Sequence, residues 1–302
     1  MWFKNLQIYQ LAEDFTATAE DLHNAMQDKA FQPCQGLDTH RSGWTSVLGK
    51  HGDQLVHATD GCLMFCMRRE ERILPAAVVR EAVDEKVDEI ELQQSRQVGR
   101  KEKSEIKDEI IVDLLPRAFT RSQRSYGYID PQHYWVILDC STATRAEDML
   151  TLMRETLGSF KVTPLAVNQS PTAIMTGWIN EQAPADVLVM DECEMKEPVE
   201  KGGVIRMRGV DLGSAEVQQH LQSGRIISKL AIEWKQRLSC LLVDDLSVKR
   251  LKFLDIVLEQ VDDSAADDAA MRFDADFALM SRELAHFIKA LCGYYGGAHS
   301  AQ

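Results

Sequence analysis

The sequence has few of the features that mark secreted, membrane-spanning or disulfide-bonded proteins. No uninterrupted apolar run approaches the ~18 residues of a membrane helix, and the first residues, Met1–Leu6, lack the apolar core of a signal peptide. The seven cysteines are odd in number, widely scattered and without a C-x-x-C pair, a pattern typical of reduced thiols. We therefore expect a soluble, cytoplasmic protein that does not enter the membrane.

Motifs for nucleotide binding and covalent catalysis are also missing: the sequence contains no Walker-type phosphate loop, no G-x-G-x-x-G and no G-x-S-x-G. Paired acids could still hold a divalent metal for phosphodiester cleavage. The candidate pairs are Asp244-Asp245, Asp262-Asp263, Asp267-Asp268 and Asp274-x-Asp276. Adjacent aspartates on a helix or strand do not face one cation together, so a metal-dependent nuclease is the least favoured hypothesis. We expect no enzymatic activity, cofactor or metal.

Positive charge is in deficit. The chain carries 47 Asp and Glu against 34 Lys and Arg, a formal net charge of -13, which argues against a simple nucleic-acid-binding protein. Much of this deficit is local, because residues 255–283 hold nine acids and only Arg272 and Arg282 as basic residues. Elsewhere the basic residues gather in four clusters, at Arg68–Arg72, Arg96–Lys107, Arg117–Arg124 and Arg206–Lys252.

Hydrophobic spacing predicts strands and helices without regular βαβ alternation, which indicates an α+β fold. Strands are expected at 2–11, 44–48, 55–59, 62–69, 125–130, 134–139, 187–190, 204–210, 226–234, 237–244 and 248–253. Helices are expected at 17–29, 142–157, 171–180, 214–221, 254–261 and 275–291. We interpret 191–200 as an acidic linker or ragged strand and 293–297 as a loose tail. The chain divides into two α+β halves, 1–165 and 166–302.

A long charged helical element interrupts the first half at residues 76–114. Pro75 and Pro116 bound it, and between them the apolar spacing fits one long helix or two helices. Its first part is acidic and its middle is basic, from Arg96 to Lys107. Charge segregated in this way along one element can steer a charged partner, so we expect a charged helical projection.

The basic clusters could be ordinary solvated surface or could bind phosphate. Aromatic residues are not interleaved with the arginines, so backbone contact without sequence recognition fits better than base stacking. The alternative is an acidic protein-interaction module with incidental basic clusters. The DNA-binding candidates are Arg68, Arg69, Arg96, Arg100, Lys101, Arg117, Arg121, Arg124, Arg206, Arg208, Lys229, Lys249 and Arg250.

Eight short segments, spread in order along the chain, together resemble the RdgC family of recombination-associated proteins. They are Trp2-Phe3-Lys4-Asn5, Phe31-x-Pro33-Cys34, Arg72-Ile-Leu-Pro75, Leu115-Pro-Arg-Ala-Phe119, Gly202-Gly-Val-Ile-Arg206, Lys229-Leu-Ala, Lys249-Arg-Leu-Lys-Phe253 and Arg272-Phe-Asp-Ala-Asp-Phe277. This chain departs from the family in its uncharged Gly209-Val210 and its short, Tyr-rich tail.

The resemblance implies a nucleoid-associated protein that binds DNA without sequence preference and without enzymatic activity. It implies a ring-shaped homodimer whose basic hole admits double-stranded DNA, with single-stranded DNA as a further partner, and functional antagonism of RecA-promoted strand exchange. It also implies that Phe119 lies at a dimer interface. From the residues alone, Phe119 could pack in the core of its own chain, but its place after a proline-marked helix end and between Arg117 and Arg121 favours exposure.

Overall fold

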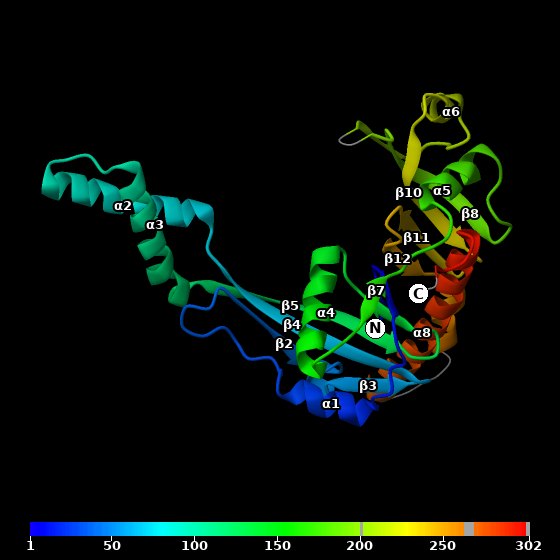
Figure 1. Cartoon of the computed structure of the whole chain (residues 1–302), viewed down its shortest axis with the longest axis horizontal. Coiled ribbons are helices and arrows are strands. Elements are labelled where there is room, and N and C mark those ends of the chain that lie inside the picture. Colours follow the sequence, from blue (N-terminus) through cyan, green and yellow to red (C-terminus); the bar gives the residue numbers. More distant parts are fainter. Residues whose placement is uncertain (200–201, 263–268, 300–302) are drawn as a thin grey trace.

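The computed structural model describes residues 1–199, 202–262 and 269–299. Within these ranges the chain forms two antiparallel sheets and eight α-helices, which agrees with the predicted α+β class. The strands of the first sheet all come from residues 7–164, and those of the second all come from residues 187–253. Figure 1 shows the first sheet in the middle of the molecule and the second at one end.

The first sheet has the strand order β2-β4-β5-β6-β1-β7, and β3 also pairs with β4. Asp60 and Gly61 join β3 to β4 with positive φ angles of 50° and 79°, as a tight Asp-Gly hairpin turn requires. The strands are β1 (Gln7–Leu11), β2 (His40–Thr45), β3 (Val56–Thr59), β4 (Cys62–Ile73), β5 (Phe119–Asp130), β6 (Trp135–Leu138) and β7 (Val162–Pro164).

Helices α1 (Ala19–Gln27) and α4 (Ala143–Leu157) cover one face of this sheet. Their buried residues, such as Met26 and Met149, pack with the odd-numbered side chains of β4. Thr142 is the N-cap of α4, and Gly158 ends the helix in the left-handed region with φ 75°.

The second sheet has the order β12-β11-β10-β8-β9, from the strands β8 (Val187–Lys196), β9 (Val204–Arg208), β10 (Ile226–Trp234), β11 (Leu238–Val243) and β12 (Val248–Phe253). Four helices accompany it, α5 (Pro171–Asn180), α6 (Ala215–Gln222), α7 (Asp255–Asp262) and α8 (Ala269–Tyr294). Arg237, before β11, donates two hydrogen bonds of 2.6 Å to the buried Glu283 carboxylate of α8. This bidentate pair holds α8 against the sheet.

The largest core contains residues of both sheets and of α8, including Phe3, Met64, Trp234 and Phe287. The backbone also connects the two parts, since the Leu6 amide donates to the Val248 carbonyl at 2.7 Å and the Val248 amide donates to the Leu6 carbonyl at 3.0 Å. The proposed division between 1–165 and 166–302 therefore stays a prediction.

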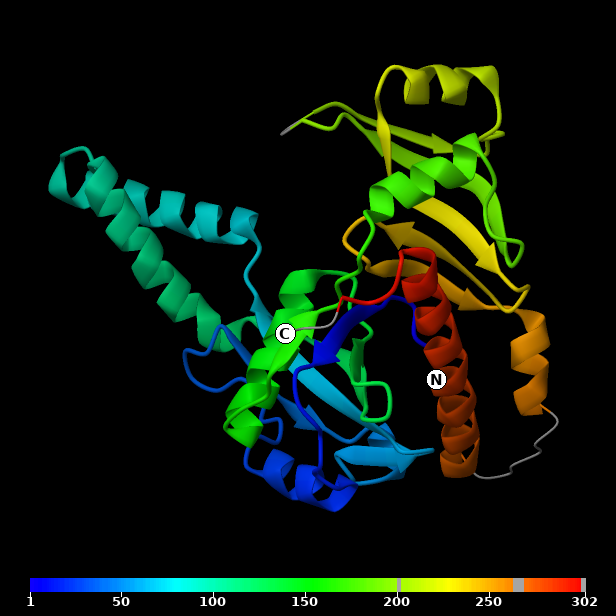
Figure 2. The same ribbon diagram turned by 45° about the vertical axis from the view of Figure 1, so that its right-hand side comes forward.

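Helices α2 (Ala76–Gln94) and α3 (Arg100–Leu114) occupy the predicted range 76–114 as two helices rather than one. Ser95 ends α2 in the left-handed region with φ 48°, and the short 3₁₀ helix η2 (Leu115–Arg117) follows α3. Val79, Val83 and Ile106 form a small core of their own. Both views show the pair extending away from the sheets (Figures 1 and 2), and we call it the α2–α3 arm.

Several predicted boundaries are wrong. β1 begins at Gln7 rather than Trp2, β2 ends at Thr45, and β5 begins six residues before the predicted Ser125. The acidic stretch after Met190 continues β8 to Lys196, while Glu200 lies outside the described residues. The tail is not loose, because Tyr295 is buried in the main core and its carbonyl accepts a bond from Gln169.

Candidate nucleic-acid interface

The arginines of β4 and β5 lie on two opposite faces of the first sheet. Arg68 pairs directly with Arg124 across the strands, whereas Arg69 pairs with Gln123 and Glu71 with Arg121. Because side chains alternate along a strand, Arg68 and Arg124 share one face, and Arg69 and Arg121 share the other. The latter face is the one that α4 covers. These four candidates therefore form two separate sites rather than one.

On the first of these faces, Arg68 is held by the protein itself. Its Nη2 donates to Ser122 Oγ at 2.9 Å and lies 3.3 Å from the buried Glu70 carboxylate, and its guanidinium stacks 4.2 Å from the centre of the Phe31 ring. These contacts fix the position of the Arg68 side chain. Arg124 is exposed and has no acidic partner among the described residues.

On the arm, Arg96 is the most constrained cation. Its guanidinium donates to both carboxylate oxygens of Glu102, at 2.7 and 2.5 Å, and these bonds lower the pKa of Glu102. Lys101 lies 3.9 Å from Glu105, a distance that makes only a weak surface pair. Arg100 is exposed and has no ion pair within the described part of the chain.

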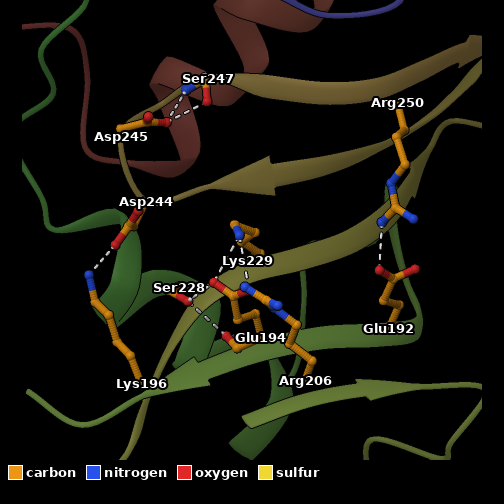
Figure 3. A network of polar contacts seen from close by, with 10 residues as sticks. All are labelled: Glu192, Glu194, Lys196, Arg206, Ser228, Lys229, Asp244, Asp245, Ser247 and Arg250. Carbon is orange, nitrogen blue, oxygen red and sulfur yellow. Dashed lines mark hydrogen bonds and ion pairs between the residues drawn. The ribbon is translucent and has the colours of Figure 1, made fainter. Parts of the chain in front are cut away.

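Two glutamates of β8 pair with the candidates on the exposed face of the second sheet (Figure 3). Glu194 accepts hydrogen bonds from Arg206 Nε at 2.6 Å and from Lys229 Nζ at 3.0 Å. Glu192 accepts one from Arg250 Nη2 at 2.7 Å and lies 3.5 Å from Arg208 Nε. All four of these cations are therefore paired with an acid.

The pKa values of the two glutamates agree with this geometry. The bond from Arg250 lowers the pKa of Glu192. For Glu194, burial raises the pKa, but the bonds from Arg206 and Lys229 outweigh it and the pKa falls. Both carboxylates are consequently ionised at neutral pH and offset the positive charge of their partners.

The sequence contained a signal for these pairs that our prediction missed. We interpreted the stretch after Met190 as a linker or ragged strand, so its acids had no defined direction. In a strand, Glu192 and Glu194 share one face, and the register with β9 places them opposite Arg208 and Arg206.

Only some of the predicted DNA-binding cations have no acidic side chain beside them to offset their charge. Within residues 1–199, 202–262 and 269–299, four of the thirteen candidates have no acidic partner within 4.0 Å: Arg100, Arg117, Arg124 and Lys249. They lie on α3, η2, β5 and β12, on elements from both parts of the molecule.

Phe119 is the most exposed large apolar residue of the sheet end next to the arm. It is 86% exposed, and its cross-strand neighbour Ile73 is 41% exposed. The alternative, that Phe119 packs in the core of its own subunit, is therefore wrong. Close to it, the arm has an apolar groove of about 700 Å³ whose lining includes Leu74, Val83 and Ile111.

The described residues show neither a cluster of metal ligands nor a membrane-spanning helix. Across the described residues, no group of three or more His, Cys, Asp or Glu side chains is placed to hold a metal ion. The candidates Asp263, Asp267 and Asp268 lie outside those residues. None of the described helices is long and apolar enough to cross a bilayer.

Comparison with known proteins decides the family. A family model described as "Putative exonuclease, RdgC" matches residues 1–298. The chain belongs to the RdgC family. The recombination-associated protein RdgC of Aeromonas hydrophila is 43% identical over 298 residues, covering 98% of both chains. The RdgC proteins of Tolumonas auensis and Serratia proteamaculans are 41% and 40% identical over 98% of this chain and 99% and 98% of theirs.

These names confirm the resemblance found in the sequence and support a recombination-associated role. They differ on activity, since the family model is described as an exonuclease and the curated relatives as recombination-associated proteins. No enzymatic activity of the chain follows from either name.

Proposed function

We propose that this chain binds DNA through the phosphate backbone, without sequence preference, and thereby restrains RecA-promoted recombination at the nucleoid. The observation that carries the proposal is the placement of the uncompensated cations. Arg100, Arg117, Arg124 and Lys249 lie on four different elements, with no single recognition helix. Dispersed Lys and Arg suit contact with phosphates along a duplex rather than readout of base edges.

A ring-shaped homodimer is the assembly that we propose for this function. The molecule is elongated and bent, with the α2–α3 arm at one end and the second sheet at the other (Figure 1). An exposed aromatic and an apolar groove lie together at the arm end, and two-fold symmetry would use each of them twice. Double-stranded DNA is the first partner that we propose, and single-stranded DNA is a second.

The alternative is an acidic interaction module that acts on the recombinase directly. The ion pairs of Glu192 and Glu194 favour it, because they leave the second sheet with little net positive charge. A direct protein contact would need no exposed positive field on that sheet.

Mobility-shift titrations at two salt concentrations, on two duplexes of unrelated sequence, test the proposal. We expect similar affinity for both duplexes and much weaker binding at the higher salt. Binding to RecA but to neither duplex would favour the interaction module. Incubation of the same duplexes with magnesium tests for cleavage.

A further inference from the structure

We propose that a pocket between β4, β5 and the first turn of α4 is a subsite for a single DNA phosphate, with Arg145 as its principal ligand. This inference rests on the proposed DNA-binding function and adds a residue that the sequence did not single out. The pocket has a volume of about 230 Å³, and three arginines line it: Arg69, Arg121 and Arg145.

The three guanidiniums differ in how the protein holds them. Arg69 lies 3.1 Å from Asp148 of α4, and Arg121 is paired with Glu71 across the strands. Arg145 is half-buried, and its side chain has no hydrogen bond or ion pair within the described part of the chain. The pocket therefore contains three positive and two negative groups. Two of the three arginines are paired with the two acids, and the third, Arg145, is free to bind a ligand.

The position of Arg145 in α4 also favours an anion. It is the third residue of the helix, and the first turn contains no acidic residue. A cation there is disfavoured by the helix dipole, which stabilises negative charge at this end. Asp148, one turn later, is already 3.1 Å from Arg69. A phosphate between Arg145 and the strands would offset the unfavourable placement.

The chemistry of the lining selects phosphate over a base or an apolar ligand. Besides the arginines and their acids, the lining consists of Gln123, Thr142 and Thr144, so it offers no ring or aliphatic surface on which a base could stack. Guanidiniums bind phosphate oxygens in bidentate geometry, and threonine hydroxyls can donate to the remaining oxygens.

The pocket also lies where a duplex could reach it. Its strand residues are close to the ends of β4 and β5 that lead into the arm, and α4 lies between the arm and the second sheet (Figure 1). A duplex that contacted both Arg100 on the arm and Lys249 on the second sheet would therefore pass α4.

The test is the salt dependence of duplex binding for Arg145→Gln, compared with wild type and with Arg154→Gln. Arg154 lies on the same helix, outside the pocket, 3.7 Å from Glu147. We expect Arg145→Gln to weaken binding roughly fivefold or more and to reduce the slope of log K against log salt by about 0.9, the value for one phosphate. Arg154→Gln should change neither quantity appreciably, and Arg145→Lys should restore most of the slope.

Equal slopes for wild type and Arg145→Gln, with tight binding in both, would overturn the subsite and leave the proposed function intact. Failure of wild type to bind duplex DNA would overturn the proposed function and the subsite together. Thermal unfolding of each variant shows whether the fold is retained. If Arg145→Gln unfolds, Arg145→Met carries the comparison, because it keeps an extended side chain and removes the charge: a slope reduced by about 0.9 supports the subsite, and a wild-type slope overturns it.

Discussion

At the scale of single residues, Phe119 separates stability from assembly. Its side chain is 86% exposed, so Phe119→Ala removes almost no buried surface within the subunit. We expect the free energy of unfolding to change by less than about 0.5 kcal/mol, compared with about 3–5 kcal/mol for truncating a core phenylalanine. We also expect weaker dimerisation, and a larger loss of DNA retention than a typical arginine loss causes.

Thermal unfolding and sedimentation of the variant provide the measurement, and Met271→Ala is a control at another exposed apolar residue, on α8. A loss of several degrees in melting temperature with the dimer intact would show that Phe119 stabilises the subunit and does not join two of them.

Glu194 tests whether internal acids limit DNA binding. Glu194→Gln removes the charge that offsets Arg206 and Lys229, so we expect affinity for duplex DNA to rise by about two- to fivefold. The matched control is Glu233→Gln on β10, because Glu233 has no ion pair in the described residues. Fluorescence anisotropy measures the affinity of both variants for duplex DNA. An equal gain in the control would mean that net charge alone matters.

At the scale of elements, the candidate cations on the arm and those on the second sheet can both be compared with cations of α8. Reversal to Glu should weaken DNA binding by about 1 kcal/mol, roughly fivefold, at each candidate, because it removes an attraction and adds a repulsion. The substitutions are Arg96→Glu, Arg100→Glu, Lys101→Glu, Arg206→Glu, Arg208→Glu, Lys249→Glu and Arg250→Glu.

Arg272→Glu and Arg282→Glu on α8 are the matched controls, and we expect little effect from either. Arg282 is paired at 3.1 Å with Asp60, in the turn of the β3–β4 hairpin, so melting temperatures should accompany its binding data. If the reversals on α8 weakened DNA binding as much as those on the arm and the second sheet, the assignment of DNA to the arm and the second sheet would be contradicted.

At the scale of the whole molecule, the net charge of -13 makes the salt dependence of binding informative. We expect log K to fall linearly with log salt, with a slope near -0.9 for each phosphate neutralised, and we expect similar slopes on unrelated duplexes. Six or more neutralised phosphates would reduce affinity about 10³-fold or more between 50 and 200 mM salt. Anisotropy titrations at four salt concentrations give the slope. A flat response, or a strong preference for one duplex, would contradict backbone binding.

Much of the fold follows from local patterns along the chain. The bounds of α5 agree with prediction, and the capping of α4 and the Asp60-Gly61 turn are equally local, because each depends on residues within a few positions of one another. Errors occur where a neighbouring strand overrides local composition. β5 begins at Phe119 in a polar, arginine-rich stretch because it pairs along its whole length with β4.

The sequence by itself determined the family, the α+β class and the positions of the basic clusters, since these depend on residue identities and short-range spacing. The tertiary structure alone decided which basic residues keep their charge. Glu194 is 12 residues from Arg206, and Glu192 is 58 from Arg250, and only the order of the second sheet brings each acid to its partner. Arg145 likewise meets Arg69 and Arg121 through the packing of α4 on the first sheet. Electrostatic interactions depend on distance in space, and sheet pairing and helix packing set that distance between residues far apart along the chain.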